Sequence, residues 1–265
     1  MTLRNVRLAI AAALAFGLTA PAAAQWSERP SGFQPRYQRE DGGFQPRYQR
    51  EDGGGFRPRY ERGEDRDFGR ARRGGDGDFD FYVLALSWSA GFCELGGAQK
   101  ARRQCAPGAG AGFVVHGLWP QYERGFPENC SAFDRPLPRA ALDNVQGLFP
   151  DEGLARYEWR KHGTCSGKGP GEYFADVRRA REQVRIPGRF SSMRTDAHVT
   201  PMDVLRAFEE ANPRLRPGMA AVGCRAGVLQ EVRVCFSKDL RDFRPCPEVA
   251  RKSCRARDIR VPAPL

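Results

Sequence analysis

Apolar residues along this chain gather into short runs that predict β-strands. The run at 79–88 is apolar on both faces of an extended chain, which predicts a buried strand, and the run at 113–119 predicts another. At 228–236, apolar side chains alternate with Glu231, Arg233 and Cys235, so a third strand is expected there.

Helical spacing of apolar residues appears in three further segments: 157–162, 173–184 and 202–211. The last segment has a recognisable start, because Thr200 can cap it and Pro201 fits the first turn. Asp203 completes a sequence similar to a capping box. Strands and helices that do not alternate regularly predict an α+β fold.

Two blocks at 113–120 and 157–165 contain two of the three histidines, His116 and His162. Histidine has an unperturbed pKa of about 6.5, so it can give or take a proton near neutrality, and a pair suggests an acid and a base. His198 lies in a predicted loop, where a solvent-exposed side chain without a catalytic role is expected.

A helix through the second block would place three chemical groups on one face. Glu158, Lys161 and His162 stand at i, i+3 and i+4, so a carboxyl, an ammonium and an imidazole would be neighbours. Trp159 would point the other way, toward the core. Gly163 suits the left-handed residue that follows a helix end.

The N-terminus predicts export. Two arginines precede an apolar run at 8–18 that is too short to span a bilayer, since a retained anchor needs roughly 20 apolar residues. Small residues at 22–24 offer a cleavage site. We expect 1–24 to be a signal peptide, and the mature protein to be periplasmic or secreted, with no stable membrane anchor.

The segment 25–78 has too few aliphatic residues to build a core and predicts a disordered extension. Its stretch at 32–42 recurs almost unchanged at 43–53. The Arg, Tyr and Phe residues could stack on single-stranded RNA. Twelve arginines against eleven acidic residues favour a solvated linker instead. Most of the net charge of +11 therefore belongs to 79–265, where it would attract a polyanion.

An even number of cysteines follows residue 90: Cys93, Cys105, Cys130, Cys165, Cys224, Cys235, Cys246 and Cys254. In an exported chain this count predicts four disulfides. A zinc site at His162 and Cys165 is disfavoured, because no CxxC pair exists and thiolate ligation would leave odd cysteines. Spacing alone leaves the pairing open.

The two blocks resemble a known family. His-Gly-Leu-Trp-Pro at 116–120 and Glu-Trp-x-Lys-His-Gly-Thr-Cys at 158–165 closely resemble the active-site blocks of the ribonuclease T2 family, the secreted acid endoribonucleases. The stretch at 81–88 followed by Cys93 looks like the first strand of that family. The resemblance implies one catalytic domain at 79–265, with a central antiparallel sheet and flanking helices. It also implies four disulfides: Cys93 with Cys105, Cys130 with Cys165, Cys224 with Cys254, and Cys235 with Cys246.

The resemblance also implies the chemistry. Single-stranded RNA would be cleaved by its own 2′-hydroxyl through a 2′,3′-cyclic phosphate, which requires a base, an acid and stabilisation of a negative phosphorane, but no metal or cofactor. His162 would be the base and His116 the acid, although the labels could be exchanged. Lys161 and Glu158 would lie near the phosphoryl oxygens. A monomer is expected.

Four residues are candidates for substrate binding: Trp119, Gln121, Tyr122 and Tyr157. Trp119 could stack on a base, or equally belong to the core. Gln121 stands where many relatives have an aspartate, so base preference cannot be carried over. Tyr157 replaces a histidine that usually binds the phosphate; a phenol can donate a hydrogen bond but carries no positive charge.

Two other classes remain as alternatives. A non-catalytic RNA-binding or host-interaction protein on the same scaffold would explain Tyr157, but the retained proton-transfer groups argue against it. A metal-dependent phosphodiesterase would need clustered Asp and His ligands, which the sequence does not show.

Overall fold

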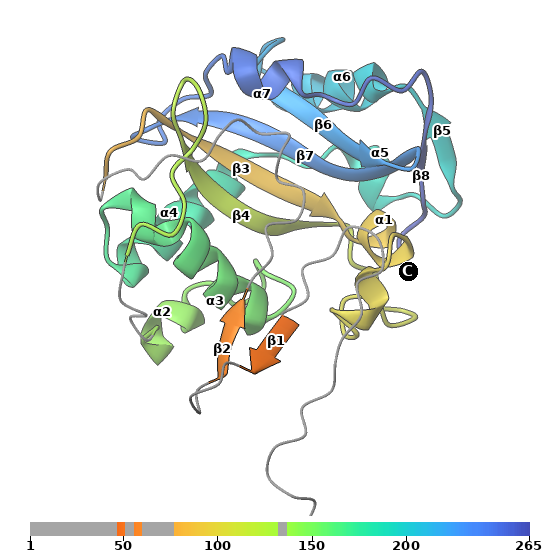
Figure 1. The fold of residues 1–265 in the computed structure, drawn as a ribbon. Coiled ribbons are helices and arrows are strands. Elements are labelled where there is room, and N and C mark those ends of the chain that lie inside the picture. The colour runs from red at the N-terminus through yellow and green to blue at the C-terminus, as the bar shows by residue number, and fades with distance from the viewer. Residues whose placement is uncertain (1–46, 51–55, 60–76, 132–136) are drawn as a thin grey trace, which may run out of the picture.

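The computed structural model describes residues 47–50, 56–59, 77–131 and 137–265 (Figure 1). The predicted signal peptide and most of the predicted extension lie outside the described residues. Within the extension, strands β1 (Arg47–Arg50) and β2 (Phe56–Arg59) pair antiparallel, and the disorder expected at 25–78 stays a prediction. Backbone hydrogen bonds carry this pairing, and a low content of apolar side chains does not prevent it.

The centre of the molecule is a sheet of six strands: β3 (Phe81–Trp88), β4 (Phe113–Gln121), β5 (Ala197–Val199), β6 (Ala220–Arg225), β7 (Val228–Ser237) and β8 (Ile259–Val261). Its order is β4-β3-β7-β8-β5, with β6 also paired to β7. Every pairing is antiparallel except the single parallel contact between β7 and β8. The predicted α+β class with a largely antiparallel sheet is confirmed.

Short helices surround the sheet: α1 (Ser89–Glu94), η1 (Gly97–Gln99), α2 (Arg139–Asp143), α3 (Glu152–Lys161), η2 (Gly163–Ser166), α4 (Pro170–Gln183), α5 (Gly188–Ser191), α6 (Pro201–Ala211) and α7 (Pro247–Arg251). Helices α3 and α4 lie beside β4, and α6 and α7 lie beside β6 (Figure 1). The predicted start of α6 is confirmed, since Thr200 and Asp203 cap it reciprocally and Pro201 is its first residue.

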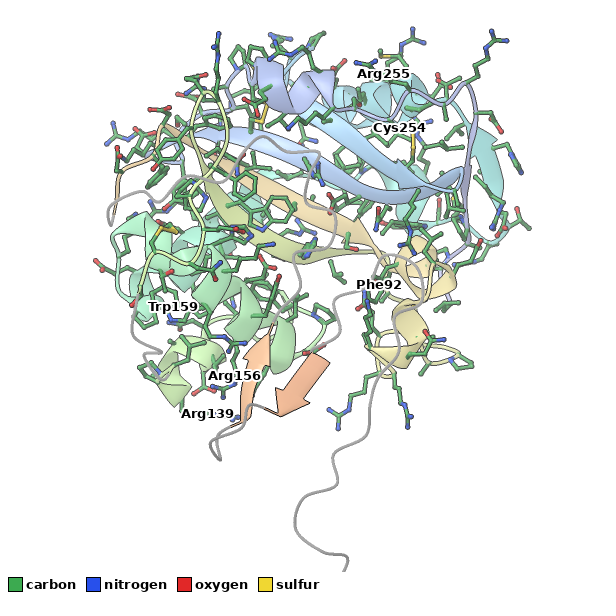
Figure 2. The ribbon with its side chains drawn as sticks, in the orientation of Figure 1. Phe92, Arg139, Arg156, Trp159, Cys254 and Arg255 are labelled. Atoms are coloured by element: carbon green, nitrogen blue, oxygen red, sulfur yellow. A yellow bond between two sulfur atoms is a disulfide. The ribbon has the colours of Figure 1, made fainter. Side chains whose placement is uncertain are left out.

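Both faces of the sheet are buried, as the apolar run at 79–88 predicted. From β3, Tyr82, Leu84 and Leu86 enter the main core with residues of the helices, such as Trp159 and Phe174. The alternate β3 residues Phe81 and Val83 form a smaller cluster on the other face. On the surface of the α2–α3 region, Arg156 and Arg139 extend outward and pair with Glu152 (Figure 2).

Four disulfides hold the fold: Cys93–Cys105, Cys130–Cys165, Cys224–Cys254 and Cys235–Cys246. These are the pairs that the resemblance implied. In the described part of the chain, no helix is both long and apolar enough to cross a membrane.

Candidate active site

His116 owes its position to an irregularity of the sheet. β4 is the edge strand beside β3, and the pairing places Ala85 opposite Gly117 but Leu86 opposite Val115. His116 is thus the extra residue of a β-bulge, a feature that re-aims a side chain at the rim of a sheet. Its imidazole is 37% exposed, so it can meet a ligand.

Helix α3 brings the second histidine. Its first turn is capped by the side chain of Asp151, which accepts from the backbone N–H of Leu154, and His162 is the residue that ends the helix. The prediction for Gly163 was wrong: the chain turns directly into η2, and the left-handed residue is Gly167, with φ of 71°. A Cβ at Gly163 would lie 2.4 Å from the Trp159 ring, so close packing explains this glycine.

Glu158 is the most deeply buried charged group of the site, with 1% of the residue exposed. Its Oε2 accepts a hydrogen bond of 2.7 Å from Trp119 Nε1, and its Oε1 lies 3.7 Å from His116 Nε2. Burial raises the pKa of Glu158, and the charges of His116 and Lys161 and the bond from Trp119 oppose that rise only in part. Gly117 allows this approach, because a Cβ there would stand 2.1 Å from Oε2.

His162 lies in a dry environment. The residue is 5% exposed, its ring is 5.4 Å from that of Trp119 and 6.4 Å from that of Phe126, and its Nδ1 has no hydrogen-bond partner among the residues that the structure describes. Burial holds the pKa of His162 well below 6.5, and the positive charges of Lys161 and His116 lower it further.

His116 experiences the opposite balance. Burial alone would lower the pKa of its imidazole, but the hydrogen bond to Glu231 and the charges of Glu158 and Glu231 outweigh burial and the charge of Arg233. The pKa of His116 is therefore raised. Both imidazoles pack against the indole of Trp119, at 5.2 Å for His116 and 5.4 Å for His162. One ring favours the protonated form and the other the neutral form, the arrangement that acid–base chemistry needs.

Lys161 and Tyr157 lie together on α3. The Lys161 ammonium is 5.8 Å from the centre of the Tyr157 ring and 4.0 Å from Glu128 Oε2, and 14% of the side chain is exposed. The loop that carries Glu128 is tied to α3, since the N–H of Asn129 donates to the carbonyl of Lys161. The Cys130–Cys165 disulfide joins the same loop to η2.

The remaining predicted binding residues differ in how far they are buried and in which groups they contact. Trp119 is half-buried and makes the contacts described above, so it combines a core role with a place at the site. Gln121 is 5% exposed and donates to the carbonyl of Pro120. Tyr122 packs partly against the main core.

Sequence reasoning missed four residues that lie around the histidines and Lys161: Phe126, Glu128, Glu231 and Arg233. The alternation in β7 already placed Glu231 and Arg233 on one face of a strand. Two adjacent charges on a buried strand face were an available signal. Nothing in the local pattern around Phe126 or Glu128 pointed to the site.

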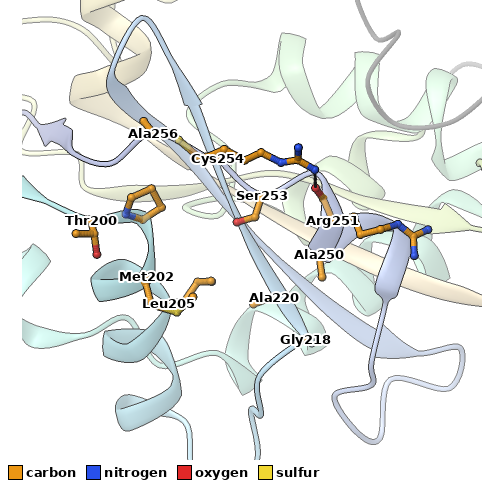
Figure 3. A pocket seen from close by; sticks show the side chains of 12 residues that line it. Thr200, Met202, Leu205, Gly218, Ala220, Ala250, Arg251, Ser253, Cys254 and Ala256 are labelled. Atoms are coloured by element: carbon orange, nitrogen blue, oxygen red, sulfur yellow. Dashed lines mark hydrogen bonds between the residues drawn. The ribbon is translucent and has the colours of Figure 1, made fainter.

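A separate hollow of about 430 Å³ lies between α6, β6 and α7 (Figure 3). Met202 and Leu205 line one side, and Ser253 and Cys254 line another. None of its lining residues is a predicted catalytic or substrate-binding residue. Among the described residues, no group of three or more His, Cys, Asp and Glu side chains is arranged to hold a metal ion.

Comparison with known proteins gives a consistent result. The profile described as the ribonuclease T2 family matches residues 79–246. A ribonuclease from Aeromonas hydrophila is 36% identical over 185 residues, which cover 68% of this chain and 82% of that protein. Ribonuclease I from Escherichia coli K12 is 27% identical over 206 residues, covering 62% of this chain and 77% of that one.

Solved structures agree on the fold. A variant of RNase MC1 in complex with 5′-UMP aligns with a TM-score of 0.52 at 20% identity, over 68% of this chain and 97% of that one. Trichomaglin, an S-like ribonuclease, aligns with a TM-score of 0.53 at 23% identity, over 69% and 97%.

The fold is thus that of the disulfide-bonded α+β enzymes with which these solved structures align. The chain belongs to the ribonuclease T2 family, and its activity is that of an endoribonuclease.

Proposed function

We propose that the enzyme cleaves single-stranded RNA by transphosphorylation, with His162 as general base and His116 as general acid. The observation that carries this assignment is that two imidazoles packed on one indole have pKa values moved in opposite directions. The sequence left the two labels exchangeable. The environments favour one assignment, because a base must begin neutral and an acid must begin protonated.

In the first step, neutral His162 takes the proton of the 2′-hydroxyl, whose oxygen attacks the adjacent phosphorus. His116 gives its proton to the 5′-oxygen as the P–O bond to that oxygen breaks, so the products are a 2′,3′-cyclic phosphate and a free 5′-hydroxyl. Lys161 supplies positive charge to the pentavalent phosphorane. Glu158 orients His116 and, in its protonated form, can donate to a phosphoryl oxygen. The reaction uses no cofactor.

The substitution at Tyr157 fits tuning of the site. Tyr157 lies beside the Lys161 ammonium. A positively charged side chain at position 157 would repel that ammonium, whereas the phenol does not. Trp119, Gln121, Tyr122 and Tyr157 remain the proposed substrate contacts, and base preference is not assigned.

The same proposal covers the cellular setting. A chain with the predicted signal peptide at 1–24, the predicted extension at 25–78 and a disulfide-bonded catalytic domain at 79–265 fits an exported, periplasmic or secreted enzyme. We propose that it acts as a monomer.

The test is to incubate the purified protein with RNA and with DNA, each in excess chelator, and to analyse the products. Release of 2′,3′-cyclic phosphate ends from RNA, with DNA intact, is expected. Inert RNA that is nevertheless bound would favour the non-catalytic RNA-binding alternative. Activity that chelator abolishes would favour a metal-dependent phosphodiesterase.

A further inference from the structure

Glu231 of β7 stands directly behind His116. Its Oε2 is 3.2 Å from His116 Nδ1, while its Oε1 forms an ion pair with Arg233, two residues further along the same strand. On the other side of the imidazole, Nε2 faces Glu158 Oε1 at 3.7 Å. The two ring nitrogens of His116 therefore have different carboxylate neighbours, one from the sheet and one from helix α3.

The surroundings of Glu231 favour a fixed, ionised carboxylate. Burial would raise its pKa, but Arg233 and His116 overcome burial and bring the pKa of Glu231 to about 2. Arg233 is held in turn, since its side chain is 14% exposed and its guanidinium lies 5.5 Å from the centre of the Trp119 ring. Gly223 on β6 leaves room, because a Cβ there would stand 2.9 Å from Glu231 Cγ.

We propose that Glu231 is a positioning residue for His116. The Glu231 carboxylate accepts the Nδ1–H of His116 and so directs Nε2 toward Glu158 and the scissile phosphate. This inference rests on the proposed function, because it assigns the atom of His116 that transfers the proton. Arg233 serves Glu231 by balancing its charge, and it also braces the indole against which both imidazoles pack.

The chemical consequence concerns what His116 becomes after it has given a proton away. A neutral imidazole has two tautomers, and the hydrogen bond at one nitrogen selects between them. With Nδ1–H held by Glu231, the proton lost to the 5′-oxygen comes from Nε2, and the regenerated lone pair faces the site. That lone pair can then take a proton from water in hydrolysis of the cyclic phosphate. The other tautomer would present an N–H where an acceptor is needed.

The decisive variant is Glu231→Gln, which keeps the shape of the side chain and removes its charge. We expect kcat to fall about 10- to 100-fold, as for partners that orient metal-bound histidines, with KM for a dinucleotide substrate little changed. The basic limb of the pH profile should move to lower pH, because Glu158 would be the remaining carboxylate that raises the pKa of His116, while burial and the charge of Arg233 lower it. Unchanged kcat and an unchanged basic limb would overturn the proposal.

A matched control is available at the edge of the sheet. His198 Nδ1 lies 2.8 Å from Asp258 Oδ2, a histidine–carboxylate pair of the same kind on an exposed surface. Asp258→Asn should leave kcat and the pH profile as they are. An equal loss in both variants would indicate a general effect of removing a carboxylate and would overturn the specific role of Glu231.

Two further measurements serve if Glu231→Gln folds poorly, since the substitution removes a buried carboxylate that pairs with Arg233. Glu231→Asp keeps the charge while shortening the reach, and it should keep the fold and lower kcat. In the unaltered protein, nitrogen NMR of the neutral His116 ring should show the proton on Nδ1. A ring protonated on Nε2 would overturn the inference. This spectrum needs no catalysis, so it separates failure of the positioning role from failure of the proposed reaction.

Discussion

Trp119 donates its indole N–H to the buried carboxylate of Glu158 at 2.7 Å, and the same ring contacts His116 and His162, the two proposed catalytic histidines. A residue expected either to stack on a base or to fill the core thus links an edge strand to helix α3. The indole sets the spacing between the two imidazoles, because both of them pack against it.

The strongest effect is expected from His162→Ala. Loss of the general base should lower kcat by ~10²–10⁴-fold, while RNA binding stays largely intact, because the remaining cationic and hydrogen-bonding groups are retained. Single-turnover cleavage and a binding titration at a pH where cleavage is slow measure the two quantities. An equal loss of binding would mean that His162 holds substrate and does not act as the base.

Trp119→Phe separates the indole N–H from the ring. The aromatic contacts are largely kept, but Glu158 loses a hydrogen bond to a charged group, worth about 1.5–3 kcal/mol. Since that bond lowers the pKa of Glu158, the pKa should rise further in the variant. We expect kcat to fall roughly 10- to 100-fold on the same basis. A variant with normal kcat would show that the N–H bond has no part in the reaction.

Gly117→Ala tests the close approach of β4 to α3. The new Cβ would meet Glu158 Oε2 at 2.1 Å and Trp119 Nε1 at 2.4 Å, so these groups must move. Overpacking of this kind costs about 1–3 kcal/mol of the free energy of unfolding. The control is Gly171→Ala in α4, where a Cβ meets nothing within 4 Å and helix propensity favours Ala. Thermal unfolding should show destabilisation for Gly117→Ala alone.

The buried, neutral His162 should make stability depend on pH. Its pKa is well below 6.5 in the folded state, so below pH 6.5 the unfolded chain binds a proton that the folded chain does not. The contribution of neutral His162 to the free energy of unfolding is present above pH 6.5. It is lost as the pH falls toward the folded pKa, by about 1.4 kcal/mol per pH unit. His162→Phe should remove that loss. Urea unfolding at pH 5 and pH 8 measures it, and a constant difference between the two proteins would contradict the prediction.

The site illustrates why local patterns were informative for some residues and wrong for another. The sequence predicts a helix at 157–162 that would put Glu158 and Lys161 on one face, and α3 contains both residues. Gly163 was assigned a left-handed role because a glycine often follows a helix end. Glycine is needed at 163 because the rings of Trp159 and Tyr173 leave no room for a Cβ. These rings come from two different helices, and no local pattern contains such a contact.

Periodicity and spacing were enough for the strands around 79–88, 113–119 and 228–236, for the capped start of α6 and for the two blocks that carry the histidines, because these features depend on neighbours within a few positions. The disulfide pairing required a resemblance to other chains. Only the folded chain decided that a bulge would aim His116, that Glu158 and His162 would be buried, and that Glu231 would stand behind the imidazole. Burial and charge pairing between distant segments set the pKa of each group, and these are properties of packing in three dimensions.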